Sequence, residues 1–151
     1  MNGFLARLSH ALPPPLRAHA TPARLVLLAE FLRFGVVGVI GFCFDAGTVY
    51  ATRGVLGLYG AGILSYFVAA SVNWGLNRCW TFRGRGNGPA HRQWALFLAA
   101  NLAGFALNRG TYIALIATSP LCVAYPVLAV AAGSIAGMFC NFSLSRAIVF
   151  R

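Results

Sequence analysis

Eight polar residues stand inside otherwise apolar stretches of the chain, and their side chains suit binding rather than covalent chemistry. An asparagine amide can donate to and accept from hydroxyl groups, and an arginine guanidinium matches the geometry of a phosphate. Together they predict a site for a molecule that carries both hydroxyls and a phosphate. The candidate ligands are Asp45, Asn73, Asn77, Arg78, Asn108, Arg109, Asn141 and Arg146.

The sequence contains no recognisable arrangement of residues for catalysis or for holding a metal. It has no Ser-His-Asp set and no Walker-type glycine loop, and its three histidines lie in polar segments. The four cysteines form neither a C-x-x-C motif nor a cluster with histidine, so they read as small apolar side chains. We therefore predict a protein that is not an enzyme and that needs no cofactor or metal.

Charged residues are scarce, and this scarcity indicates the class of protein. They make up 9% of the 151 residues, whereas a soluble domain carries about 25%. The two acids are Glu30 and Asp45, and all twelve cations are arginines. These arginines fall between apolar runs rather than on one solvated face, which disfavours a nucleic-acid-binding protein. The composition predicts a membrane protein.

Four apolar stretches have the length of about 20 residues that a membrane-spanning helix needs. They cover about Phe34–Thr52, Ala61–Trp80, Trp94–Ala117 and Leu121–Leu144. The predicted fold is therefore an all-α integral membrane protein with four transmembrane helices. Residues 31–151 form this domain, and residues 1–30 form an N-terminal tail with a short interfacial helix. Residues 22–34 are expected to lie on the membrane surface before the first span.

The arginines also predict the orientation of the chain. Four precede the first span, three lie in the central loop and one ends the chain, whereas the two outer connections contribute only Arg53. Because cytoplasmic loops carry the excess of cations, both termini and the central loop should face the cytoplasm.

The chain resembles itself at two offsets. "GFCFDAGTVYA" at residues 41–51 aligns with "GFALNRGTYIA" at 104–114, and "NWGLNRCWTFR" at 73–83 aligns with "NFSLSRAIVFR" at 141–151. Each comparison keeps five identical residues of eleven. The sequence therefore predicts two helical hairpins, residues 31–83 and 94–151, in the same orientation, as in parallel transporter repeats.

Two pairings are expected within this arrangement. Asp45 aligns with Asn108 on a polar stripe, and we expect it to pair with Arg109 near the middle of the bilayer, where an unpaired charge is costly. Arg78 and Arg146 each follow an aromatic residue by four positions, which predicts cation–π contacts with Trp74 and Phe142. A purely structural Asp45, and arginines that merely snorkel to the interface, remain alternatives.

Three of these stretches also resemble the GtrA-like family of small four-helix membrane proteins. They are "FLRFGVVGVIGFCFD", which opens the first span, and the two motifs that close the second and fourth spans. The resemblance implies a flippase that moves a polyprenyl-phosphate-linked monosaccharide across the bacterial inner membrane for cell-surface polysaccharide synthesis or glycosylation. It implies membrane lipids, a membrane glycosyltransferase and self-association as partners. The matching site residues are Asp45, Asn73, Asn77, Arg78, Asn141 and Arg146.

Two other functions remain open at this point. One is a membrane scaffold that recruits a glycosyltransferase, for which Asp45 should tolerate asparagine. The other is a small proton-coupled exporter similar to the small multidrug resistance proteins, which also have four helices and an acid in the first span. The strong arginine asymmetry disfavours the exporter, because those proteins pair subunits of opposite orientation.

Overall fold

The computed structural model describes residues 21–86 and 88–151, and this part of the chain is helical. Residues 1–20 of the predicted tail lie outside the described residues. The elements are α3 (Pro22–Leu76), η1 (Asn77–Thr81), α4 (Ala90–Thr118), α5 (Pro120–Ala124), α6 (Pro126–Leu144) and η2 (Ser145–Val149).

The first hairpin is α3, which folds back on itself at Gly57. This glycine has φ 66° and ψ 175°, a left-handed backbone conformation that glycine adopts without a steric penalty. It divides α3 into two segments, residues 22–56 and 58–76. Thr21 caps the start by accepting a hydrogen bond from the Arg24 amide. The helix is unbroken from Pro22 to Gly57, so residues 22–34, which are predicted to lie on the membrane surface, are continuous with the first span.

The second hairpin consists of α4, the short α5 and α6. Ser119 ends α4 and caps α5, accepting a hydrogen bond from the Cys122 amide. A β-carbon at Gly137 would lie 2.9 Å from the Gly104 carbonyl oxygen, and one at Gly133 would lie 2.6 Å from that of Asn108. Glycine at both positions of α6 therefore lets its backbone approach α4 closely along the hairpin.

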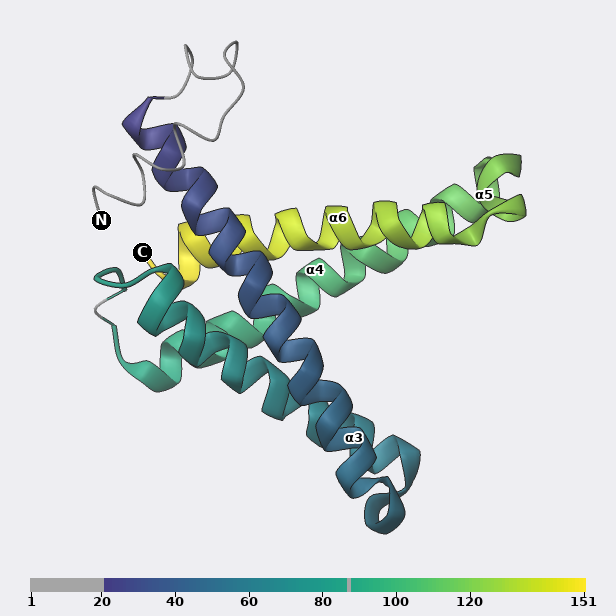
Figure 1. Cartoon of the computed structure of the whole chain (residues 1–151), viewed down its shortest axis with the longest axis horizontal. Helices are drawn as coiled ribbons and strands as arrows, with labels where there is room; N and C mark the ends of the chain where they lie inside the picture. The colour runs from purple at the N-terminus through teal and green to yellow at the C-terminus, as the bar shows by residue number, and fades with distance from the viewer. Residues whose placement is uncertain (1–20, 87) are drawn as a thin grey trace.

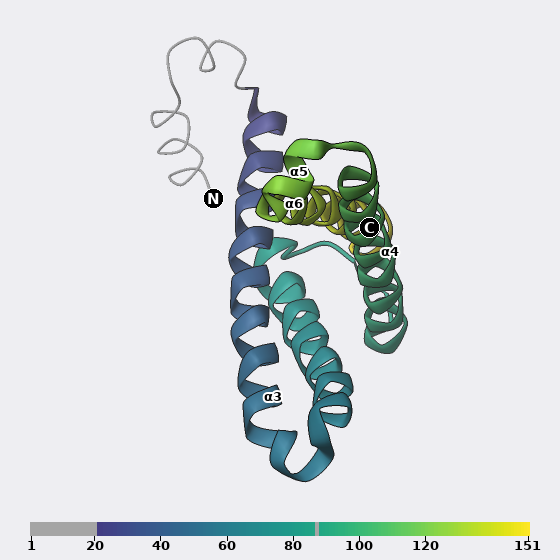
Figure 2. The same cartoon turned by 90° about the vertical axis from the view of Figure 1, so that its right-hand side faces the viewer.

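The two hairpins meet at one end and diverge toward the other (Figure 1). The start of η1, the central connection and the C-terminus lie at the joined end, whereas the turn at Gly57 and α5 occupy the two separated tips. In Figure 2 the first segment of α3 lies on one side and α4 on the other, with α6 and the second segment of α3 between them. The hairpins therefore contact each other mainly where the chain passes between them.

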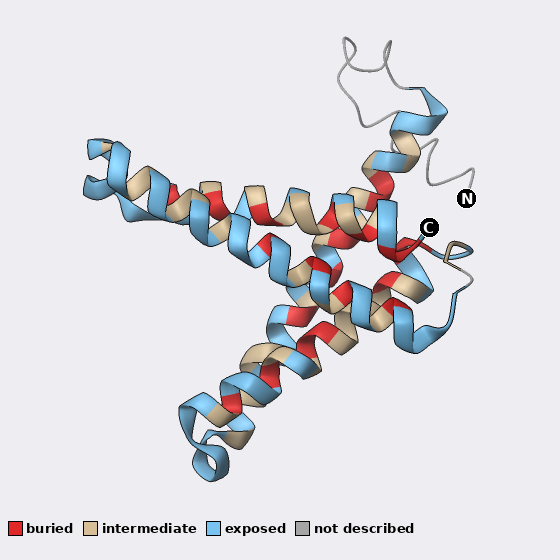
Figure 3. Cartoon of the chain, turned by 180° about the vertical axis from the view of Figure 1, so that it is seen from behind, coloured by how far each residue is buried: buried red, intermediate tan, exposed pale blue. Residues whose placement is uncertain are grey.

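A cluster of aromatic side chains holds the joined end together. Phe82 and Phe150 stack with ring centroids 4.8 Å apart, and Phe142 lies 6.1 Å from Phe82. Phe34 and Phe97 complete the cluster from α3 and α4. Buried residues gather here and along the inner faces of the helices, while the tips are exposed (Figure 3). This cluster is the main tertiary core of the described residues.

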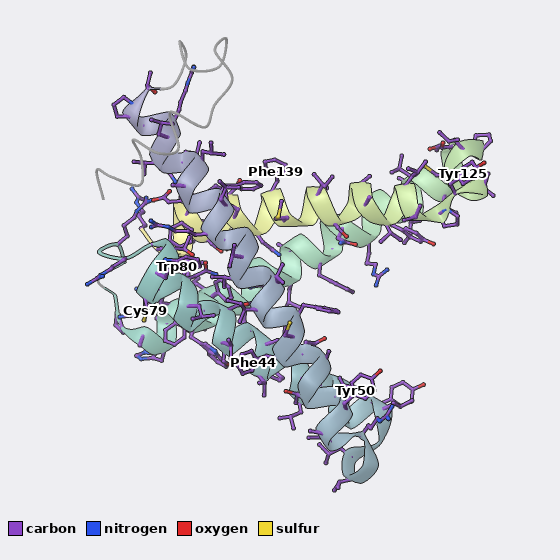
Figure 4. The ribbon with its side chains drawn as sticks, viewed as in Figure 1. Phe44, Tyr50, Cys79, Trp80, Tyr125 and Phe139 are labelled. Atoms are coloured by element: carbon purple, nitrogen blue, oxygen red, sulfur yellow. The ribbon has the colours of Figure 1, made fainter. Side chains whose placement is uncertain are left out.

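The outer faces of both hairpins are apolar. Phe44, Tyr50, Tyr125 and Phe139 project away from the helices (Figure 4), and 69% of Tyr50 is exposed. Two stretches contain an 18-residue segment apolar enough to cross a membrane: the segment within Pro22–Thr81 has a mean hydropathy of 2.1, and the one within Pro126–Val149 has 1.8. Apolar outer faces on an all-helical chain define an all-α membrane protein.

The helix α4 is not among the stretches that pass this test of length and hydropathy. It contains Asn101, Asn108 and Arg109 within a single helical run of 29 residues. Both asparagines line a cavity that residues of both hairpins enclose. Its lower hydropathy therefore coincides with a polar inner face.

Candidate functional site

Each of the two repeated motifs forms a π-helical turn at the end of its hairpin. The Phe82 amide donates to the Asn77 carbonyl oxygen and the Phe150 amide to that of Ser145, both at 2.8 Å and across five residues. Asn77 is 1% exposed and Ser145 0%. π-helical turns are rare and frequent at functional sites. Here they bring the two phenylalanines into the core and hold Arg78 and Arg146 within the widened turns.

A glycine faces an asparagine at matched places in the two hairpins. A β-carbon at Gly41 would overlap the side chain of Asn73, and one at Gly104 would overlap that of Asn141. Both glycines are buried, and both asparagines also line the cavity described next. The glycines thus allow each asparagine amide to lie flat against the neighbouring helix.

A cavity of about 740 Å³ lies between the two hairpins, next to the aromatic core. Its walls combine apolar side chains with amides and hydroxyls from both hairpins. The polar residues that line it are Tyr66, Asn73, Asn77, Asn101, Asn108, Ser134 and Asn141. The structure thus brings together four of the predicted site residues, namely Asn73, Asn77, Asn108 and Asn141.

Several oxygens at this cavity are buried without a hydrogen-bond partner in the described residues. They are Oη of Tyr66 and Oδ1 of Asn73, Asn77 and Asn141. These oxygens have almost no accessible surface, and those of Asn73 and Asn141 lie against Gly41 and Gly104. The amide and hydroxyl groups that line the cavity can both donate and accept, so the cavity suits a ligand with several hydroxyl groups.

Arg78 is held from two sides at the joined end. Its guanidinium lies 5.6 Å from the ring centre of Trp74, which confirms the predicted cation–π contact. Its Nη1 donates to Oε1 of Gln93 at 2.6 Å, and Nε1 of Trp74 donates to the same oxygen at 3.2 Å. Gln93 is neutral and 3% exposed. Arg78 therefore has a fixed orientation and no acid among its described partners.

Arg146 has a different partner. Its Nε donates to Oε2 of Glu30 at 2.6 Å, while Nη1 of Arg85 donates to Oε1 of Glu30 at 3.0 Å. The predicted cation–π contact of Arg146 with Phe142 is wrong, because Phe142 is buried in the aromatic core and the guanidinium turns to Glu30 instead. Glu30 is 7% exposed, so this acid joins three separate parts of the chain in a sheltered place.

The predicted ion pair between Asp45 and Arg109 is also wrong. Within the part of the chain that the structure describes, the ion pairs are those of Glu30 with Arg85 and Arg146. The guanidinium of Arg109 instead lies 5.6 Å from the ring centre of Phe105 on its own helix. Along their own helices, Asp45 lies 11 residues after Phe34 and Arg109 lies 12 residues after Phe97 of the aromatic core, roughly 16–18 Å in each case. Neither residue lines the cavity.

Sequence reasoning missed several residues of this region. Tyr66 and Ser134 line the cavity, and Gln93, Glu30 and Arg85 hold the joined end. The sequence does contain one signal for two of them. The offset of 63 residues that aligns Gly41 with Gly104 also aligns Glu30 with Gln93, so the two residues that bind the repeated arginines occupy matched positions.

These features define a class: an all-helical membrane protein with a polar cavity between two hairpins and arginines at one end of it. The chain belongs to the GtrA/DPMS transmembrane-domain family, whose model matches residues 33–150. At the level of this family, membership supports a role in the translocation of lipid-linked sugars across a membrane. A comparison with curated proteins found no match.

Proposed function

We propose that this protein flips a polyprenyl-phosphate-linked monosaccharide across the bacterial inner membrane, for cell-surface polysaccharide synthesis or glycosylation. The observation that carries the proposal is the cavity of about 740 Å³ lined by amide and hydroxyl groups from both hairpins, whose outer faces are apolar. Sugar hydroxyls can hydrogen-bond to these groups, while a polyprenyl tail stays in the surrounding lipid. Such a path lowers the cost of moving a polar head group through hydrocarbon.

In this proposal, the sugar and the phosphate occupy different parts of the site. The asparagines that line the cavity bind the sugar, with Asn73 and Asn141 contributed by matched positions of the two hairpins. The arginines of the joined end supply positive charge for the phosphate, because charge-assisted hydrogen bonds are about twice as strong as neutral ones. Translocation requires no bond to be made or broken, so the proposed function is transport without catalysis.

We further propose that the four long helical segments are four spans, arranged as two parallel repeats. The matched π-helical turns, the matched glycine–asparagine contacts and the two sequence offsets support this arrangement. Both termini and the central connection are assigned to the cytoplasm. The arginine distribution supports this assignment, as does the meeting of the central connection and the C-terminus at one end of the molecule.

The proposed partners are a membrane glycosyltransferase that supplies the lipid-linked sugar and a second copy of this chain. Asp45 and Arg109 retain a proposed part in the transport cycle rather than in head-group binding, because neither lines the cavity. Each of them lies in a helix that also contributes cavity residues.

The substrate class is tested by the lipid that remains bound through purification. Native mass spectrometry of the protein in mild detergent should reveal a polyprenyl-phosphate sugar. A variant with Asn73→Leu and Asn141→Leu should lose that lipid, whereas Val130→Ala on the exposed face of α6 should keep it. Ordinary phospholipid alone on the unmodified protein would contradict the proposed substrate.

A further inference from the structure

We infer that the two matched arginines have unequal roles: Arg78 binds the substrate phosphate, and Arg146 fastens the joined end through Glu30. The difference arises from one pair of matched positions, which carries Glu30 in the first hairpin and Gln93 in the second. This inference rests on the proposed function and adds a residue-level assignment of the phosphate site.

The two arginines are held by contacts that correspond across the molecule. Gln93, in the second hairpin, binds Arg78 of the first, and Glu30, in the first, binds Arg146 of the second. The donor–acceptor distance is 2.6 Å in both contacts. Arg78 and Arg146 are related by the 68-residue offset, and Glu30 and Gln93 by the 63-residue offset. The geometry is therefore matched, and the chemical difference is an amide against a carboxylate.

That difference determines what a phosphate meets at each arginine: the cluster of Glu30 with Arg85 and Arg146 keeps a net charge of +1, but it places a carboxylate directly against Arg146. Both oxygens of the Glu30 carboxylate are engaged, one by Arg146 and one by Arg85. A phosphate approaching Arg146 would have to displace this carboxylate or lie beside it, and two anions so close repel each other. Gln93 offers Arg78 a hydrogen bond without charge, so the guanidinium of Arg78 keeps its full attraction for a phosphate.

Gln93 acts as a positioning residue for Arg78. Its Nε2 donates to the carbonyl oxygens of Gly86 and Val149, at 3.3 and 3.2 Å, which fixes the amide so that Oε1 points to Arg78 and Trp74. Gly86 has φ 73°, and a β-carbon there would overlap Nε2 of Gln93. Because Gln93 uses one donor of Arg78, Nη1, the remaining N–H groups of the guanidinium can bind phosphate.

The place of Arg78 in the chain supports its role. Its neighbour Asn77 lines the cavity, and so does Asn73, one turn earlier in the same helix. The corresponding neighbour of Arg146 is Ser145, which does not line the cavity, whereas Asn141, one turn earlier, does. A phosphate at Arg78 therefore leaves the attached sugar next to the amides of the cavity.

The test exchanges the carboxylate of Glu30 and the amide of Gln93 between their two positions. Binding of a fluorescent short-chain polyprenyl-phosphate sugar is measured by titration of the purified protein in nanodiscs. Arg78→Gln and Gln93→Glu should each weaken binding more than tenfold, because the first removes the charge and the second neutralises it. Arg146→Gln should change affinity less than threefold. The exchange variant Glu30→Gln with Gln93→Glu should bind again, and adding Arg146→Gln to it should now abolish binding.

Equal losses in Arg78→Gln and Arg146→Gln would overturn the inference but leave the proposed function standing. Failure of the unmodified protein to bind the probe would instead count against the proposed function. If Arg146→Gln does not fold, Arg146→Lys keeps the ion pair with Glu30 and should bind as the unmodified protein does. Arg78→Lys, which loses the planar contact with Trp74, should bind several times more weakly. Equal affinities of these two lysine variants would also overturn the inference.

Discussion

Replacing Gly104 by alanine should damage the binding cavity from a position that does not itself bind the sugar. A β-carbon at Gly104 would overlap the Asn141 side chain, so the amide would have to leave its present position. Overpacking of this kind costs about 1–3 kcal/mol of stability. Turning the amide away from the cavity also removes one hydrogen bond, worth about 0.5–1.5 kcal/mol, so affinity for the head group should fall about twofold to tenfold.

The matched control is Gly110→Ala on the same helix. A β-carbon there would meet nothing within 4 Å, and Gly110 does not line the cavity. Thermal unfolding in detergent and titration with a polyprenyl-phosphate sugar measure the two effects. Gly104→Ala should lower both stability and affinity, while Gly110→Ala should lower neither. Unchanged affinity in Gly104→Ala would refute the argument that the glycine keeps Asn141 in the cavity.

Three further outcomes are expected. Phe150→Ala should destabilise the protein by about 3–5 kcal/mol in thermal unfolding, since Phe150 is fully buried and stacks on Phe82, whereas the half-exposed Phe139→Ala should cost far less. Asp45→Asn and Arg109→Gln should act on stability independently, and a double-mutant cycle with a coupling above about 0.5 kcal/mol would show that the two side chains interact after all. Reporters fused after Arg151 and within residues 84–89 should both be cytoplasmic and one at Gly57 periplasmic; any other pattern contradicts the parallel arrangement.

Apolar runs and polar spacing are enough to predict the helices and part of the candidate site. Asn73 and Asn77, like Asn108 on α4, interrupt apolar sequence at helical spacing, so the sequence alone predicts the helix faces that they share. The same holds for Trp74 and Arg78, because side chains four positions apart on a helix are neighbours.

Features that depend on the angle between the hairpins cannot be predicted in this way. The expectation that Asp45 meets Arg109 assumes a compact bundle, which keeps matched positions close at every depth. The hairpins instead diverge away from their joined end (Figure 1), and the ion pairs of the described residues do not join these two side chains. Hydropathy carries no information about the angle between the hairpins.

Gln93 and Glu30 are missed by sequence reasoning for a different reason. Gln93 lies in the first turn of α4 and Glu30 is a single acid among apolar residues of α3, and neither pattern by itself predicts a role. Their role becomes visible when the π-helical turns bring Arg78 and Arg146 to them from the opposite hairpins. Aligning the sequence with itself places Glu30 and Gln93 at matched positions. Only the folded structure shows that they contact the two repeated arginines.

The central claim is translocation of a lipid-linked sugar, and the most direct measurement is flipping in reconstituted vesicles. A fluorescent polyprenyl-phosphate monosaccharide is incorporated in both leaflets, and a membrane-impermeant reagent quenches the outer one. Vesicles with the unmodified protein should expose the inner pool to the reagent over time, and vesicles with Arg78→Gln should do so at least tenfold more slowly. An inner pool that stays protected to the same extent with the unmodified protein as in protein-free vesicles would contradict the account.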